Sequence, residues 1–286
     1  MFVWSLQMKK ISVVLILTIV LLVSAVSFVA CDKKAEKNPA SDKQYIGIIS
    51  AMDNEIAALV RDASIEREET IGGEKYYIGT LHGQNVVITK SGIGKVFASS
   101  GATILLDNYN IEKLIFTGIA GGVADGTDVL DEIVATSLVE HDYGIITNDG
   151  FEWRSGDPGF GNKPGEYYEC DKALVDIAYN AAVKVLGAEF VHKGTIATGD
   201  QFIASEDYVA MLQTKYNAVA CEMEGASVAK ICIRYGVPFV VIRALSDKAD
   251  GKAHESYANF GDIAAENSCN IVFEILDALG AEANKN

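Results

Sequence analysis

Short apolar segments rich in β-branched residues alternate along the chain with segments that repeat their apolar residues at helical spacing. The first apolar segment, residues 45–50, precedes a helical pattern over residues 53–62 that has acidic residues in its first turn. Similar apolar segments recur at 218–221 and 239–245. Such segments are typical of strands buried between helices, so their alternation with helices predicts α/β layers.

The full pattern predicts seven strands and six helices. The predicted strands are 45–50, 75–81, 85–90, 114–118, 191–197, 218–221 and 239–245. The predicted helices are 53–62, 95–108, 174–186, 206–216, 224–235 and about 259–279. Residues 142–168, rich in glycine, aspartate and aromatic residues, are predicted to be a loop. Because no second linker or repeat interrupts the pattern, residues 44–282 are predicted to form one domain.

The N-terminus has the features of an export signal. Lys9 and Lys10 precede an uninterrupted apolar run over residues 11–30, which ends directly before Cys31. A basic segment, an apolar segment and a small residue before a cysteine predict a lipoprotein-type signal peptide of 30 residues. An uncleaved transmembrane anchor is the alternative, because about 20 apolar residues span a bilayer. Polar residues 31–43 form a flexible tether, which predicts an extracytoplasmic protein anchored through lipid at Cys31.

The charge of the chain narrows its possible partners. The formal net charge is −15, and the residues after Cys31 carry 22 basic against 39 acidic side chains. This sign argues against nucleic-acid binding and against electrostatic attraction to anionic lipid. The four remaining cysteines form no CxxC pair or other metal-binding spacing. They are interpreted as core residues, and a disulfide remains possible.

Carboxylates follow several predicted strands directly. Glu222 and Glu224 end the segment that begins at Ala218, Asp247 ends the strand at 239–245, and Glu55 lies just beyond the first strand. Ligands of open α/β sheets bind at the carboxyl ends of the strands. A lone acid there often serves a helix N-terminus only, but four acids at strand ends favour a functional site. Arg243, four residues before Asp247, could orient a neighbouring carboxylate.

Two glycine-rich segments also follow strands. Ser91-Gly-Ile-Gly94 and Thr117-Gly-Ile-Ala-Gly-Gly122 lie at such positions, where glycine lets the backbone approach a ligand. Neither matches the dinucleotide-binding pattern or the phosphate-binding loop. Each is therefore either a tight turn between strand and helix or part of a ligand site.

Six motifs in order resemble the bacterial 5′-methylthioadenosine/S-adenosylhomocysteine nucleosidases of the purine nucleoside phosphorylase-like superfamily. The motifs are Ile46-Gly-Ile-Ile-Ser-Ala-Met-Asp-Asn-Glu-Ile56, Lys90-Ser-Gly-Ile-Gly-Lys-Val96, Phe116-Thr-Gly-Ile-Ala-Gly-Gly122, Thr198-Gly-Asp-Gln-Phe-Ile203, Cys221-Glu-Met-Glu-Gly225 and Val241-Ile-Arg-Ala-Leu-Ser-Asp247. The resemblance covers residues 45–280. It implies a single-domain three-layer αβα fold with a mixed central sheet.

The resemblance also implies a reaction, the hydrolysis of the bond between adenine and a 5′-thio-substituted ribose. Asp247 matches the general acid that protonates adenine N7, and Ser246 the residue that steadies it. Glu55 matches the base that activates water, and Glu224 the carboxylate that binds ribose hydroxyls and stabilises positive charge on the sugar. Met223 resembles a residue that packs against the ribose.

Further positions match residues that contact the substrate or its surroundings. Phe202 resembles the residue that stacks on adenine, and the Ile203 backbone resembles the group that reads the edge of the base. Arg243 resembles a residue that orients Glu55 and the water, and Ser91 matches a contact on the ribose or water side. Tyr257 lies where the family has phenylalanine near the 5′-alkylthio group. The complete set of expected substrate contacts is Ser91, Phe202, Ile203, Met223, Glu222, Arg243, Ser246 and Tyr257.

The resemblance implies a homodimer in which the partner completes the tail pocket, with residues 142–168 and helix 95–108 as candidate interface. No metal or organic cofactor is implied. A phosphorylase of the same fold is a first alternative, although it would need arginines to hold phosphate, and none occurs in Ile115-Phe116-Thr117 or Ser91–Gly94. A futalosine-type nucleosidase and a non-catalytic surface protein that binds nucleosides or acts in adhesion are the others.

Overall fold

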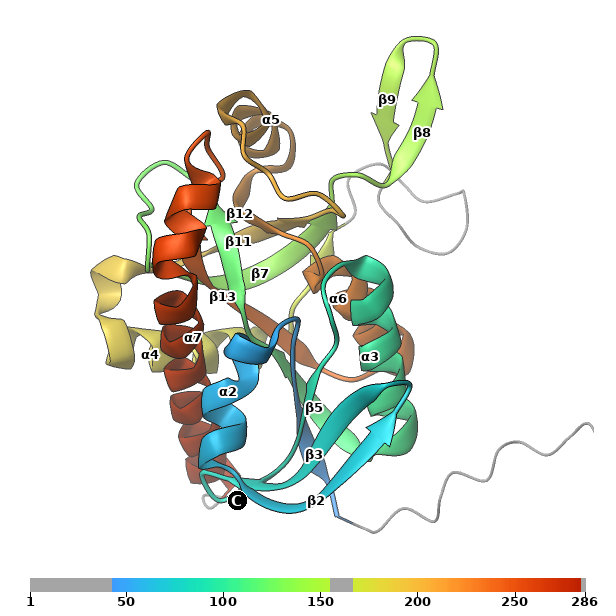
Figure 1. Ribbon diagram of the computed structural model, residues 1–286, viewed down its shortest axis with the longest axis vertical. Helices are drawn as coiled ribbons and strands as arrows, with labels where there is room; N and C mark the ends of the chain where they lie inside the picture. The colour runs from blue at the N-terminus through green and yellow to red at the C-terminus, as the bar shows by residue number, and fades with distance from the viewer. Residues whose placement is uncertain (1–42, 155–166, 284–286) are drawn as a thin grey trace, which may run out of the picture. The chain divides into compact units, whose positions relative to one another are not determined.

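The central sheet brings apolar strands from distant parts of the sequence side by side (Figure 1). The computed structural model describes residues 43–154 and 167–283, all within one compact unit. In these residues the sheet has eleven strands in the order β10-β7-β11-β12-β6-β13-β5-β1-β4-β3-β2. Their bounds are β1 (Tyr45–Ser50), β2 (Ser64–Ile71), β3 (Glu74–Leu81), β4 (Gln84–Lys90), β5 (Ile111–Phe116), β6 (Ile119–Gly122), β7 (Glu132–Glu140), β10 (Tyr168–Glu169), β11 (Val191–Thr198), β12 (Ala218–Glu222) and β13 (Phe239–Asp247).

The sheet is mixed, and one part of it closes on itself. β1 runs parallel to β4 and β5, and β13 runs parallel to β5 and β6, whereas β2, β3 and β4 are antiparallel. An additional antiparallel pairing between β7 and β13 joins β7, β11, β12, β6 and β13 into a ring. β13 is buried along its whole length and belongs to both parts. Its first residues pair with β5 in the open part, and its carboxyl end pairs with β6 in the closed part.

Helices cover both faces of the sheet, as Figure 1 shows. α3 and α6 pack together on one side, and α7 packs against α2 and α4 on the other. The helix bounds are α2 (Asp53–Asp62), α3 (Lys95–Asn108), α4 (Lys172–Leu186), α5 (Glu206–Tyr216), α6 (Gly225–Tyr235) and α7 (Ala253–Ala283), with a 3-10 turn, η1 (Ala188–Phe190). Each side has its own apolar core against the sheet. The predicted three-layer αβα fold with a mixed sheet is confirmed.

The longest strand that the sequence pattern failed to predict is β7. The sequence pattern assigned residues 132–140 to no element, yet Glu132 and Glu140 at the two ends of this strand are both buried. Glu140 is stabilised there by two lysines, Lys230 at 2.9 Å and Lys95 at 3.5 Å. Ion pairs from neighbouring elements, which a single segment does not reveal, thus allow the strand to end in buried acids.

Several other elements also differ from the prediction. β2 forms an edge strand, and the predicted loop contains a hairpin of β8 (Gly144–Thr147) and β9 (Gly150–Trp153). α7 begins at Ala253, six residues before the expected start near 259. The added turns place His254 and Tyr257 three residues apart on one helix face, which matters for the site described below.

The expected signal peptide, the lipidation site Cys31 and all of the tether except residue 43 lie outside the described residues. Within the residues that the structure does describe, no helix has both the length and the apolar character needed to cross a membrane.

Candidate active site

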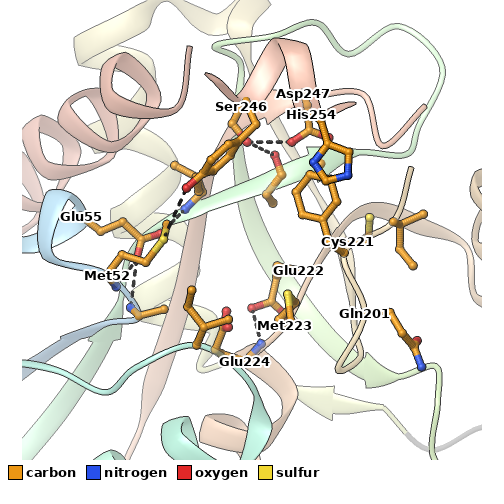
Figure 2. Close-up of a pocket in the computed structure, with 18 residues that line it drawn as sticks. Met52, Glu55, Gln201, Cys221, Glu222, Met223, Glu224, Ser246, Asp247 and His254 are labelled. Atoms are coloured by element: carbon orange, nitrogen blue, oxygen red, sulfur yellow. Dashed lines mark hydrogen bonds between the residues drawn. The ribbon is translucent and has the colours of Figure 1, made fainter. Parts of the chain in front are cut away.

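A cavity of about 400 Å³ opens at the carboxyl ends of β1, β12 and β13. Figure 2 shows Glu55 and Met52 on one side, Asp247 and His254 across from them, and Glu222, Met223 and Glu224 beneath. The lining residues are Ala51, Met52, Glu55, Ile93, Ile119, Ala120, Gly121, Gln201, Phe202, Ile203, Cys221, Glu222, Met223, Glu224, Ser246, Asp247, His254 and Tyr257. The three acids expected to be catalytic therefore face one mainly apolar cavity.

Glu55 is held at the start of α2 by backbone N–H groups. Its Oε2 accepts hydrogen bonds from the N–H groups of Ala51 at 2.9 Å and Met52 at 2.8 Å. Its Oε1 accepts one from Ile119 at 2.9 Å. Burial raises the pKa of Glu55, while the positive charge of Arg243 and these three donors oppose the shift. The carboxylate is thus fixed in position with a basicity increased by burial, which suits a general base.

Gly118 leaves room for the Glu55 carboxylate. A Cβ atom at residue 118 would lie 2.6 Å from Glu55 Oε1 and 3.2 Å from Arg243 Nη1. We expect Gly118→Ala to lower kcat about 100-fold, because displacing a catalytic group by about 1 Å has effects of this size. Steady-state kinetics would measure the loss. Gly251→Ala is the matched control, since its Cβ would meet nothing closer than 3.4 Å. Equal kcat values for Gly118→Ala and wild type would show that the position of Glu55 is unimportant.

Glu222 and Arg243 form a buried ion pair beneath the cavity. Arg243 Nη2 donates to Glu222 Oε2 at 2.8 Å, and its guanidinium lies 4.1 Å from the centre of the Phe116 ring. The same carboxylate accepts hydrogen bonds from the N–H groups of Glu224 at 3.0 Å and Gly225 at 2.7 Å. Glu222 therefore fixes the backbone at the start of α6.

These contacts change the roles expected for two residues. Glu222 was expected to contact substrate, but its oxygens already accept four hydrogen bonds within the protein, including one from the Thr198 hydroxyl. Arg243 was expected to orient Glu55, but its hydrogen bond goes to Glu222, and its effect on Glu55 is electrostatic. Both residues position other groups, while the substrate contact expected of Glu222, which lines the cavity, stays a prediction. The spacing of the motifs in the sequence does not reveal with which carboxylate Arg243 forms an ion pair.

Glu224 directly precedes α6, and its side chain contacts the glycine-rich segment before α3. Its Oε1 accepts a hydrogen bond from the Gly94 N–H at 2.8 Å. Gly94 has φ of +93°, a conformation that favours glycine and turns its N–H toward the carboxylate. Burial and the nearby charge of Glu222 raise the pKa of Glu224 to about 8. Positive charge arising in the cavity would favour the ionised form, so this carboxylate is poised to stabilise a cationic sugar.

Asp247 lies at the end of β13, where two donors orient it. Oδ2 accepts a hydrogen bond from the Ser246 hydroxyl at 2.8 Å, and Oδ1 accepts one from the Ala249 N–H at 2.8 Å. Ser246 and Asp247 are both buried, and burial raises the pKa of Asp247. The raised pKa helps this group to hold a proton, as a general acid must.

Aromatic side chains line the side of the cavity nearest Asp247. Phe202 stacks on His254 with ring centroids 4.6 Å apart and an interplanar angle of 21°. Tyr257 meets Phe202 edge-on at 6.2 Å, and its hydroxyl donates to Met52 Sδ at 3.7 Å. Ile203 also lines the cavity. A flat heteroaromatic group can stack here beside a hydrogen-bonding acid.

The structure separates Ser91 from the other expected residues. Its side chain is buried, does not line the cavity, and donates to the carbonyl of Ser50 at 3.1 Å. This hydroxyl joins β1 to the segment after β4, and the expected substrate contact of Ser91 stays a prediction. His254, which was assigned no role from the sequence, does line the cavity because α7 begins early.

The cavity contains acids without the clustering that a metal requires. Within residues 43–154 and 167–283, no three His, Cys, Asp or Glu side chains lie together in an arrangement able to hold an ion. The lining among these residues also contains no lysine or arginine. Three separate carboxyl groups around a neutral aromatic site suit acid and base chemistry at a glycosidic bond.

The chain matches proteins of known family over this whole region. The family model described as the phosphorylase superfamily matches residues 45–277. The chain is 40% identical over 238 residues to a 5′-methylthioadenosine/S-adenosylhomocysteine nucleosidase of Halalkalibacterium halodurans, covering 82% of this chain and 99% of that protein.

Solved structures show the same similarity. The crystal structure of the 5′-methylthioadenosine/S-adenosylhomocysteine nucleosidase of Neisseria meningitidis in complex with methylthio-immucillin-A matches with a TM-score of 0.73 and 34% identity, covering 82% of this chain and 99% of that one. The futalosine hydrolase of Helicobacter pylori matches with a TM-score of 0.72 and 30% identity, covering 82% of this chain and 98% of that one.

Proposed function

The chain belongs to the phosphorylase superfamily and, within it, to the 5′-methylthioadenosine/S-adenosylhomocysteine nucleosidases, and we propose that it works as a hydrolase on both of these nucleosides. It cleaves the N-glycosidic bond and releases adenine and the 5-thio-substituted ribose. The observation that carries this proposal is the convergence of Glu55, Glu224 and Asp247 on one cavity. The chemistry follows from the surroundings of each acid.

Asp247 donates its proton to N7 of adenine as the bond between the base and ribose C1′ breaks. The electron pair of that bond goes to the base, which leaves as neutral adenine because it has gained the proton. Stacking against Phe202 holds the base in plane with the acid. The raised pKa of Asp247 keeps the proton available at higher pH than an exposed aspartate would.

On the opposite side of the sugar, Glu55 takes a proton from water while the water oxygen bonds to C1′. The oxocarbenium-like transition state places positive charge on the ribose, and Glu224 stabilises it while binding the ribose hydroxyls. Asp247 ends ionised and Glu55 protonated, and exchange with solvent restores both. No cofactor takes part in these steps.

Water is the nucleophile because the cavity offers nothing to hold phosphate. The lining in the described part of the chain has no lysine or arginine, and Arg243 is committed to Glu222. Phosphate bound there would face three acids without a cation. This charge pattern supports hydrolysis over phosphorolysis.

The direct test of substrate class is adenine release by purified protein beginning at Asp32. The panel is methylthioadenosine, adenosylhomocysteine, adenosine and 6-amino-6-deoxyfutalosine, each with and without phosphate. We expect phosphate-independent release that is fastest for the two thio-nucleosides. Preference for the futalosine derivative would identify the second family function, and no release by folded protein would favour a binding protein.

We propose that the enzyme is a homodimer. Ile93, Val96 and Phe97 near the start of α3 are 52%, 77% and 61% exposed, and Ile93 lines the cavity. Ile146 and Phe151 of the β8–β9 hairpin are also exposed. Apolar side chains gathered beside an active site mark a surface that a second copy can cover. Sedimentation should give a dimer, and Phe97→Asp should give a monomer; a monomeric wild type would overturn this proposal.

We also propose that the enzyme works outside the cytoplasm on a lipid anchor at Cys31. The support is the sequence alone: two lysines, an apolar segment and a cysteine at its end. Metabolic labelling with a radioactive fatty acid should mark the full-length protein and not Cys31→Ser. Equal labelling of both proteins would contradict the assignment.

A further inference from the structure

Three residues from distant segments form a closed ring of hydrogen bonds beside the glycine-rich turn that precedes α3. The N–H of Lys95 donates to Asp200 Oδ1 at 2.8 Å, and Lys95 Nζ donates to Asp142 Oδ1 at 2.6 Å. The N–H of Asp200 donates to Asp142 Oδ2 at 2.9 Å. Each residue of this lysine–aspartate ring (Lys95, Asp142 and Asp200) thus contacts the other two, which fixes the relative positions of three segments.

The ring supplies hydrogen-bond acceptors that the start of α3 lacks. Gly94 precedes the helix and has no side chain that could accept from the first turn, and that turn contains no acidic residue of its own. Acids from other segments accept these N–H groups instead. Glu224 accepts from Gly94 at 2.8 Å, and Asp200 accepts from Lys95. Successive N–H groups of one turn therefore join Glu224 to the ring.

Asp200 also belongs to the segment that presents side chains to the base. Residues 199–205 connect β11 to α5 without helix or strand, and Gln201, Phe202 and Ile203 of this segment line the cavity. The position of such a segment depends on the few hydrogen bonds that its polar groups make with neighbours. The ring therefore anchors this segment two residues before the side chain expected to stack on adenine.

Partial burial distinguishes the ring from an exposed ion pair. The side chains of Lys95 and Asp142 are 17% and 14% exposed, and the buried Glu140 lies 3.5 Å from Lys95 Nζ. Burial opposes the charge of Lys95, but the hydrogen bond to Asp142 and the nearby carboxylates raise its pKa overall. Lys95 therefore stays ionised at neutral pH, and salt screens this pair less than a pair on the surface.

We propose that the lysine–aspartate ring is a positioning device for the cleavage reaction, because it holds Glu224 and the base-binding segment at a fixed separation. Among the described residues, no member of the ring lines the cavity, so each acts through the groups that it holds. A nucleoside spans this separation, with its base against Phe202 and its ribose against Glu224. The inference rests on the proposed function and deepens it, because it names residues outside the cavity that set the geometry of the reaction.

The first test compares two substitutions of Asp200 that differ in one hydrogen bond. Asp200→Ala removes the acceptor of the Lys95 N–H, whereas Asp200→Asn removes the charge and keeps a side-chain oxygen as acceptor. At pH 7 we expect kcat/KM for methylthioadenosine to fall about tenfold in Asp200→Ala and by less than about twofold in Asp200→Asn. Thermal unfolding determines how much of each variant is folded, and rates are expressed per folded molecule.

The pH profile of the same two variants separates displacement of Glu224 from loss of a charge. Burial and the charges of Glu222 and Glu55 raise the pKa of Glu224, to about 8 overall. Arg243 and the Gly94 N–H act in the opposite direction. If the alanine variant displaces the turn, this donor is lost and the acidic limb of kcat/KM shifts to higher pH. Loss of a negative charge alone would shift the limb to lower pH, and the asparagine variant measures that effect.

A second test substitutes the lysine of the ring. Lys95→Met removes the hydrogen bond to Asp142, and we expect kcat/KM for methylthioadenosine to fall about fivefold. The loss should be smaller for at least one of the 2′-deoxy and 3′-deoxy analogues, which lack a hydroxyl for Glu224 to bind. Lys230→Met is the matched control, since Lys230 binds Glu140 at 2.9 Å and is not a member of the ring.

Wild-type kcat/KM and an unmoved acidic limb in Asp200→Ala would overturn the positioning role. Equal losses in Asp200→Ala and Asp200→Asn would also overturn it, because the charge and not the hydrogen bond would then matter. An equal loss per folded molecule in Lys95→Met and Lys230→Met would have the same consequence. In each case, cleavage of methylthioadenosine by the wild type leaves the proposed function standing. No cleavage by the wild type would instead contradict the proposed function, and the inference would fall with it.

Discussion

Replacing Asp247 with asparagine is expected to lower kcat for methylthioadenosine about 1,000-fold, which lies within the range for loss of a general acid. Asparagine can donate a hydrogen bond to N7, but it cannot transfer a proton, so adenine would have to leave as an anion. The substitution nearly preserves shape, because the amide oxygen can still accept from the Ala249 N–H while the amide NH₂ donates to the Ser246 hydroxyl oxygen. Binding of the nucleoside should therefore change far less than kcat.

The pH profile separates this chemical role from a structural one. In the wild type, kcat/KM should fall as pH rises through the raised pKa of Asp247, because the ionised acid has no proton to give. The residual activity of Asp247→Asn should lack this decrease, since the amide does not titrate. A variant that keeps both wild-type kcat and the decrease at high pH would show that another group protonates the base.

Replacing Glu55 with glutamine is expected to lower kcat by about 100- to 1,000-fold, because water loses the base that accepts its proton. In the wild type, kcat/KM should fall as pH drops through the raised pKa of Glu55, where the base becomes protonated. Steady-state rates across pH measure both effects. Glu55→Gln should remove the part of this acidic limb that Glu55 sets, and retain the part set by Glu224, whose pKa is raised to about 8, and the basic limb set by Asp247.

A structural consequence accompanies this substitution and requires a control. Both oxygens of Glu55 accept backbone N–H groups, so a glutamine NH₂ must face at least one donor. Glu55→Gln is therefore expected to unfold at a lower temperature than the wild type. Thermal unfolding and nucleoside binding identify how much protein remains folded and competent. Glu66→Gln, exposed on β2, controls for loss of one charge. A rate per folded molecule equal to wild type would exclude Glu55 as the base.

The positions of the acids were predictable because they depend on strands that the sequence indicates strongly. The strands at 45–50, 218–221 and 239–245 are short β-branched segments, and the carboxyl ends of such strands meet at one edge of a sheet. Glu55, Glu224 and Asp247 therefore came together in the structure as the sequence pattern suggested. The periodicity of the helices likewise predicted the two outer layers.

The contacts beyond each segment were not predictable in the same way. β7 was missed because its buried end at Glu140 depends on Lys95 and Lys230, which come from α3 and α6. Arg243 forms its side-chain hydrogen bond with Glu222 and not with Glu55, and this pairing depends on how β12 and β13 lie in the sheet. Ser91 lies in a family motif, but its hydroxyl bonds to β1, and only three-dimensional structure distinguishes that contact from one to substrate.

The aromatic side of the site depends on where a helix begins. Residues 253–258 lack the apolar periodicity that predicts a helix, so α7 was expected about six residues too late. The early start places His254 against Phe202 and Tyr257 against Met52.

The most direct test of the hydrolytic mechanism is to determine whether the oxygen atom that joins the ribose comes from water or from phosphate. Methylthioadenosine is incubated with the enzyme in ¹⁸O-labelled water and excess unlabelled phosphate, and the sugar product is examined by mass spectrometry after brief reaction. Because the free sugar can exchange its anomeric oxygen, a parallel sample of unlabelled product is carried through the same conditions. Hydrolysis predicts free methylthioribose that contains more ¹⁸O than the exchange control and forms at a rate independent of phosphate. Formation of methylthioribose 1-phosphate would contradict it, because phosphate would then be the nucleophile.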